Sequence, residues 1–126
     1  LAARLEGVEF GQDAVNRAYL YERRNFPVLP YLVNVSEFTN RISELGNRLG
    51  KEGIKSEGLV VPPSEGAEGK VSGNVLAADK DSLAYPRMPM EILRIVYGTG
   101  NASDPGGFFP KGANGRVAGS VLNTTA

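Results

Sequence analysis

The stretch LAARLEGVEFGQDAVNRAYLYERR, residues 1–24, decides the fold of this chain. Its larger apolar residues recur at steps of three, four or seven, which places them on one stripe of a helix: Leu1, Leu5, Val8, Val15 and Tyr19. Small residues form a second seam on the neighbouring face: Gly7, Gly11, Ala14 and Ala18. A helix that is apolar or small on two faces is expected to be buried on both. We therefore predict an inner helix of a helical bundle over residues 1–24.

Two polar residues, Glu9 and Gln12, lie at the edge and in the middle of the apolar stripe. A Glu followed by a ligand three residues later is the half-site of carboxylate-bridged di-metal bundles, in which His normally takes the second position. A neutral amide oxygen is a poor substitute for imidazole as a ligand of iron or manganese. The pattern therefore favours a buried polar pair that is hydrogen-bonded to neighbouring helices. Glu9 and Gln12 remain the candidate metal ligands of the alternative interpretation.

A second helix is predicted after Pro27 and Pro30, which end the first one. Asn34 is suited to be its N-cap, with Glu37 three residues on in the manner of a capping box. Its apolar residues alternate steps of three and four, a narrow stripe against one neighbour: Val35, Phe38, Ile42, Leu45 and Leu49. Gly50 is predicted to end it as the residue that follows the C-cap.

The composition changes after residue 50, because 12 of the 16 glycines and six of the eight prolines lie in residues 51–126. Residues 59–61 and 71–75 are short strand candidates that Pro and Gly interrupt. One short helix is predicted to begin at Pro89 and to stop at Gly98. Aromatic residues argue against disorder and predict a coil that packs on the helices: Tyr85, Tyr97, Phe108 and Phe109.

Composition excludes several classes of function. The 14 basic and 14 acidic residues balance and are scattered, so no basic field is present to attract nucleic acid or anionic lipid. No apolar run approaches the roughly 20 residues of a membrane span. The chain has no Cys and no His, which removes disulfides, His-dependent triads and the commonest metal ligand.

Three Asn-x-Ser/Thr sequons begin at Asn34, Asn101 and Asn123. Together they favour a secreted glycoprotein. Asn101 and Asn123 lie in predicted coil and are the better acceptors. At Asn34, the competing interpretation is a plain N-cap.

The chain resembles the plant desiccation-related proteins, a secreted ferritin-like family. Four segments carry the resemblance and follow one another in the order found in that family: GQDAVNRAYLYER (11–23), EFTNRISELGNRLG (37–50), EILRIVYGTGN (91–101) and PGGFFPKGANGRVA (105–118). The resemblance implies the C-terminal part of a longer protein, with upstream helices as partners. Residues 1–50 would supply the later helices of a ferritin-like four-helix bundle. Residues 51–126 would form a Gly/Pro-rich, mostly irregular segment of the same domain, with one short helix.

The resemblance also implies a secreted protein of the apoplast or cell wall with a structural or protective role in desiccation stress, and the family brings no established enzymatic activity and no cofactor. In metal-binding ferritin-like relatives, Glu9 would be the Glu of the Glu-x-x-His motif, and Gln12 stands where the His would be. The alternative function is a di-metal oxidase or a metal store that holds iron or manganese. A third interpretation is binding of cell-wall polysaccharide through Phe108, Phe109 and Tyr97. Further copies of the same chain are also possible partners, in a homo-oligomer.

Overall fold

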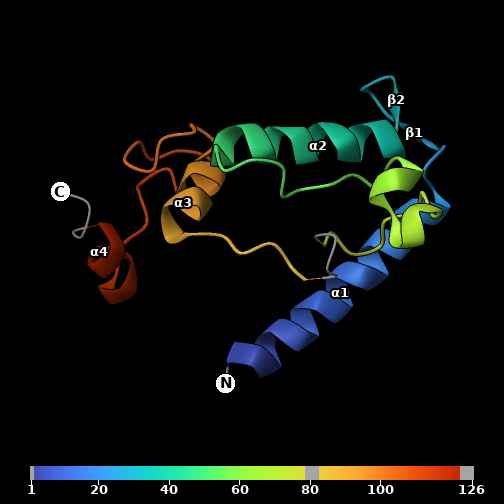
Figure 1. Ribbon diagram of the computed structural model, residues 1–126. Helices are drawn as coiled ribbons and strands as arrows, with labels where there is room; N and C mark the ends of the chain where they lie inside the picture. Colours follow the sequence, from blue (N-terminus) through green and yellow to red (C-terminus); the bar gives the residue numbers. More distant parts are fainter. Residues whose placement is uncertain (1, 79–82, 123–126) are drawn as a thin grey trace. The chain divides into compact units, whose positions relative to one another are not determined.

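The computed structural model describes residues 2–78 and 83–122 and is mainly helical (Figure 1). Its helices are α1 (Ala2–Glu22), α2 (Val35–Gly50), α3 (Pro89–Tyr97) and α4 (Arg116–Leu122). Two short strands, β1 (Pro27–Val28) and β2 (Val33–Asn34), and two single 3-10 turns, η1 (Pro63–Glu65) and η2 (Ala67–Gly69), complete the elements. The predicted mainly helical fold class is confirmed. The chain divides into two compact units, residues 1–44 with 55–85 and residues 45–54 with 86–126.

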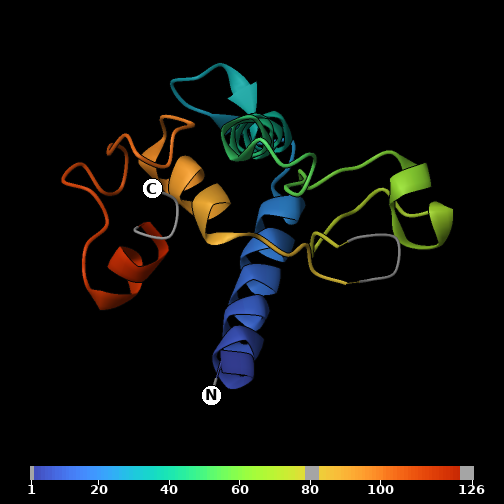
Figure 2. The same ribbon diagram turned by 60° about the vertical axis from the view of Figure 1, so that its left-hand side comes forward.

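The first unit begins with α1 and a hairpin. α1 ends at Glu22, two residues before the predicted end at Arg24. The predicted extended connection contains an antiparallel pair in which Pro27 faces Asn34 and Val28 faces Val33. In Figure 2, which views α2 nearly end-on, β2 leads directly into that helix.

The core of the first unit lies where the two strand candidates meet. Val60 and Gly73 form an antiparallel bridge, and the Asn74 backbone N–H donates to the Leu59 carbonyl at 2.9 Å. Leu59 is fully buried and Val61 nearly so. Neither run extends into a longer ladder, since Pro62 and Pro63 follow at once and Pro63 begins η1. Gly58 is also buried, and a Cβ placed there would lie 1.6 Å from Oδ1 of Asn40 on α2.

The two ends of α2 test two predicted caps. Oδ1 of Asn34 accepts a hydrogen bond from the Glu37 N–H at 2.8 Å, which confirms the predicted N-cap. The predicted C-terminal role of Gly50 is wrong, because Gly50 is the last helical residue and Lys51 takes the left-handed conformation (φ 60°). A glycine is required at this position because a side chain would have too little room. It is buried, and a Cβ there would lie 3.3 Å from Cγ of Glu91 and from Cδ1 of Ile95.

The second unit is built around α3, which begins with Pro89 at its first turn as predicted. Gly98 follows the helix with φ 70°, and its N–H donates to the Ile95 carbonyl, so the predicted stop is confirmed. The chain then turns back at Gly106 and Gly107, and the Phe108 N–H bonds the Val96 carbonyl at 2.9 Å.

Tyr97 forms the core of this unit together with Ala102, with 2% and 6% of their surfaces exposed. The Tyr97 hydroxyl accepts a hydrogen bond from the Ala113 N–H at 2.8 Å. The segment after α3 thus packs on the end of that helix at Tyr97, whereas Phe108 and Phe109, two of the coil residues behind the prediction, are exposed. α4, which follows Gly115, was not predicted, since Gly119 and Ser120 weaken its helical pattern. Within residues 51–78 and 83–122, the structure therefore has two short α-helices where one was predicted.

Candidate functional site

Glu9 and Gln12 both lie on α1 and are both exposed. The predicted apolar stripe beside them is exposed as well, since Val8, Val15 and Tyr19 keep 58%, 69% and 55% of their surfaces open. The part of the chain that the structure describes therefore does not bury α1 on two faces. For the longer protein that the resemblance implies, this burial stays a prediction.

Glu9 and Gln12 alone do not fit a di-metal site. Such a site draws carboxylates from several helices and commonly two imidazoles, whereas this pair offers one carboxylate and one amide. Within residues 2–78 and 83–122, no three His, Cys, Asp or Glu side chains gather in a group that could hold a metal ion. The pair is thus not part of any such group among the described residues, and a di-metal site would need ligands from elsewhere in the protein. No helix in these ranges is long and apolar enough to cross a membrane.

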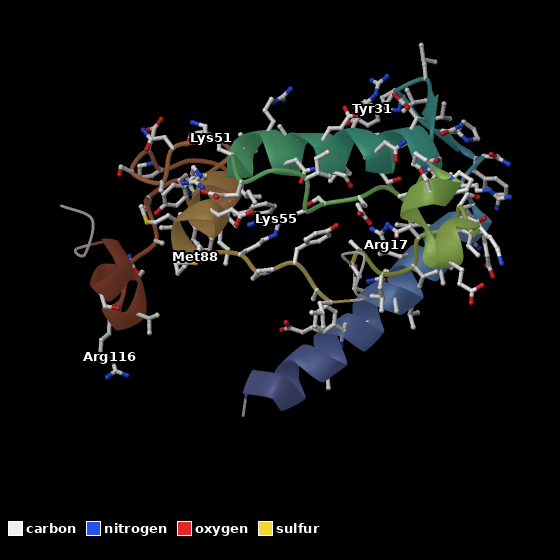
Figure 3. All side chains as sticks on the ribbon, viewed as in Figure 1. Arg17, Tyr31, Lys51, Lys55, Met88 and Arg116 are labelled. Carbon is white, nitrogen blue, oxygen red and sulfur yellow. The ribbon has the colours of Figure 1, made fainter. Side chains whose placement is uncertain are left out.

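Arg17 of α1 lies within a network of hydrogen bonds that the sequence did not indicate (Figure 3). The Arg17 guanidinium donates to three backbone carbonyls, with the shortest distances 2.7 Å to Gly58, 2.9 Å to Asn74 and 3.2 Å to Glu57. All three of its nitrogen atoms take part. Its planar fork suits such a cluster of acceptors. Arg17 therefore attaches α1 to both sides of the Val60–Gly73 bridge.

Side chains extend this group, which we call the Arg17 cluster (Arg17, Glu57, Gly58, Asn74 and Tyr85). The buried Asn74 amide donates to Oε2 of Glu57 at 2.8 Å and to the Gly58 carbonyl at 3.3 Å. The Tyr85 hydroxyl donates to Oε1 of Glu57 at 3.4 Å. The polar atoms of the cluster bond one another, so the arrangement connects α1 to the rest of its unit. The residues that Arg17 itself bonds lie 40 to 57 positions away in sequence. It bonds their backbone carbonyls, which no side-chain motif signals.

The second unit has its own polar group at the C-terminal end of α2. Glu91 of α3 is 1% exposed and pairs with Arg87 one turn earlier. Arg94 donates to the Gly50 carbonyl at 2.8 Å and to a carboxylate oxygen of Glu52 at 2.8 Å. An arginine on the last carbonyls of a helix stabilises that helix end. These contacts attach α3 to the end of α2, which is again a structural role.

The sequons differ in their surroundings. Asn34 is the N-cap of α2, whereas Asn101 lies in the loop after α3, as predicted. Asn123 lies outside the described residues.

Two of the three aromatic residues considered for polysaccharide binding are exposed. Phe108 keeps 84% and Phe109 46% of their surfaces open. Tyr97 is buried, so its ring cannot stack on a ligand.

Two curated proteins are similar to nearly the whole chain. The ferritin-like catalase Nec2 of Nesocodon mauritianus is 59% identical over 122 residues, which are 97% of this chain and 39% of that protein. The desiccation-related protein PCC13-62 of Craterostigma plantagineum is 53% identical over 116 residues, which are 92% of this chain and 37% of that protein. The chain thus spans less than two fifths of the length of either relative. No family model matches the chain, and no solved structure matches it.

Proposed function

Since this chain belongs to the desiccation-related, ferritin-like proteins, we propose that it is part of a secreted protein that protects cells during desiccation without catalysing a reaction. The observation that carries the proposal is the 53% identity to a desiccation-related protein over 92% of the chain. The amide of Gln12, at the position where a metal site of this kind would need imidazole, supports a role without metal chemistry.

In this proposal, α1 is a bundle helix, and its partners are helices from the part of the protein upstream of this chain. The exposed stripe of Val8, Val15 and Tyr19 is the face that those helices would cover. Apolar side chains exposed along one face of a helix are typical of an interface with another element. The proposed setting is the apoplast or the cell wall.

A drying experiment tests the protective role. A desiccation-sensitive enzyme is dried and rehydrated with the purified full-length protein or with an equal mass of serum albumin. We expect the full-length protein to preserve more activity than albumin does. The Glu9→Ala variant should protect equally well, because the proposed role uses no metal. Protection no better than that of albumin would contradict the proposal.

A second candidate function is removal of hydrogen peroxide by a metal centre that includes Glu9. It is favoured by one specific observation, the 59% identity to a protein named a ferritin-like catalase. In this candidate, the Glu9 carboxylate would be one ligand of iron or manganese. The chemistry that such a centre supplies is redox cycling with peroxide.

Elemental analysis and oxygen release from peroxide separate the two candidates. The protective proposal predicts less than one metal ion per chain in the protein purified from its source, and no oxygen release. The second candidate predicts two metal ions per chain and an oxygen release that Glu9→Ala abolishes. Glu22→Ala is the matched control, because Glu22 is an exposed residue at the far end of the same helix.

A further inference from the structure

The loop after α3 holds the Asn101-Ala102-Ser103 sequon in a defined conformation. Asn101 and Ser103 are exposed, while Ala102 between them is 6% exposed and anchors the loop in its unit. Oδ1 of Asn101 accepts a hydrogen bond from the Ser103 N–H at 2.9 Å, which closes an Asx turn. Because this bond turns the amide oxygen toward the chain, the amide nitrogen on the same planar group is directed away from the turn.

The rest of the loop is held without that nitrogen. The Thr99 hydroxyl lies 3.0 Å from the carbonyl oxygens of Asn101 and Asp104, to which it can donate. The Asn101 N–H in turn donates to the Thr99 hydroxyl at 3.2 Å. Among the described residues, none forms a hydrogen bond with Nδ2 of Asn101. A substituent on Nδ2 would therefore break no contact of this fold.

The Asn34-Val35-Ser36 sequon is built into regular structure instead. Oδ1 of Asn34 caps α2 through the Glu37 N–H, and Asn34 pairs with Pro27 in the hairpin. The Ser36 N–H donates to the Arg24 carbonyl at 3.0 Å, so it cannot close an Asx turn with Asn34. Ser36 is also only partly exposed. To present this sequon as a free loop, the chain would have to open both the hairpin and the first turn of α2.

We propose that Asn101 carries an N-linked oligosaccharide and that Asn34 does not. Nδ2 of Asn101 attacks the anomeric carbon of a lipid-diphosphate-linked oligosaccharide on the transferase. The bond from that carbon to the diphosphate oxygen breaks, the lipid diphosphate leaves, and Nδ2 gives up one proton to a base of the transferase. The product is a bulky, hydrophilic group on a surface loop. This inference rests on the secretion proposed above.

The test uses the full-length protein, expressed in plant cells behind an added secretory signal. Exposure to the transferase then does not depend on the protein's own leader. The secreted protein is treated with a peptide-N-glycosidase in oxygen-18 water, which converts each glycan-bearing Asn into a labelled Asp, and its peptides are identified by mass spectrometry. We expect the label at Asn101 in most molecules and at Asn34 in a small minority. An unmodified Asn101, or an Asn34 occupied as fully as Asn101, would overturn the inference.

Three variants add an independent readout. Asn101→Gln should remove the mass of one glycan from the intact protein, and Asn34→Gln should leave the glycan mass unchanged. Ser103→Ala removes the hydroxyl that the sequon requires but keeps the backbone N–H of the Asx turn, so it should lose the glycan while the fold stays intact. A glycan retained in Ser103→Ala would contradict the assignment to this sequon. Secretion itself is tested separately, by locating the protein expressed with its own leader.

Discussion

Helices α1 and α3 both carry large apolar residues, but among the side chains that the structure describes only α3 buries one of them, Tyr97. Tyr97 at the end of α3 is 2% exposed, and Glu91 on the same helix is 1% exposed. On α1, in contrast, Val8, Val15 and Tyr19 each keep more than half of their surfaces open. Because burial of apolar surface is the main stabilising term of a fold, the buried Tyr97 stabilises α3 within its unit, whereas Ile92 on the same helix is exposed. The stripe of α1 is the feature that we propose the rest of the protein to cover.

The polar contacts follow the same division. Arg17 attaches one face of α1 to the Val60–Gly73 bridge, and the stripe around Val15 lies on another face. In the second unit, Arg94 and Glu91 attach α3 to the end of α2. Each helix is thus fixed to its own unit, and the difference between them concerns what covers the remaining surface.

The largest effect is expected at Gly107, where the chain turns back onto α3. Gly107 has φ 48°, and a Cβ there would lie 2.6 Å from the Val96 carbonyl oxygen. Gly107→Ala should lower the free energy of unfolding by about 3 kcal/mol, through backbone strain and displacement of the loop. Urea unfolding of the full-length protein measures it.

Gly119→Ala is the matched control for Gly107→Ala, since nothing lies within 4 Å of a Cβ at that position of α4. It should leave the stability unchanged or slightly raised. Equal stabilities for the two variants would show that the loop does not pack on α3 as described.

A somewhat smaller effect is expected at Arg17, the attachment of α1. Arg17→Met keeps much of the side-chain length but leaves the carbonyls of Glu57, Gly58 and Asn74 without their charged donor. Loss of hydrogen bonds to a charged group should cost roughly 2 kcal/mol of unfolding free energy. Arg116→Ala, at an exposed position on α4, should change it by less than about 0.5 kcal/mol. Amide hydrogen exchange of residues 57–61 in Arg17→Met should also rise, and unchanged exchange would count against the attachment.

The smallest losses of stability are expected at two i,i+4 ion pairs, one buried and one exposed. Glu91 pairs with Arg87 at 1% exposure, whereas Glu37 pairs with Arg41 with both side chains largely exposed. Glu91→Gln should cost about 1–2 kcal/mol, because it weakens a buried charged contact. Glu37→Gln should cost about 0.3–0.5 kcal/mol. Thermal unfolding of both variants checks the ratio, and equal losses would mean that the burial of Glu91 adds nothing.

Local signals in the sequence were sufficient to predict where some helices begin and end. The Asn34 cap, the Pro89 start and the Gly98 stop of α3 each depend on residues within one turn, and each is confirmed. The prediction for the C-terminal end of α2 was wrong because the role of Gly50 does not depend on its backbone conformation. It comes from the close approach of Glu91 and Ile95, about 40 residues later in the chain.

Long-range features could not be predicted in the same way. The Arg17 cluster joins backbone carbonyls, which every residue possesses, so no residue type marks them. α4 escaped prediction because its short sequence, RVAGSVL, has little helical propensity. For the candidate metal ligands Glu9 and Gln12, the sequence identified the spacing, but the described residues contain no group of three or more His, Cys, Asp or Glu side chains that could hold a metal ion.

The central claim is that the Val15 face of α1 is covered in the full-length protein. This chain has no cysteine, so a thiol can be placed at Val15, or at Asp13 on the opposite side of α1, and its alkylation followed by peptide mass spectrometry. Val15→Cys in the folded full-length protein should react slower than Asp13→Cys by on the order of a hundredfold, because reaction requires local opening. Equal rates at the two positions would contradict the bundle assignment of α1.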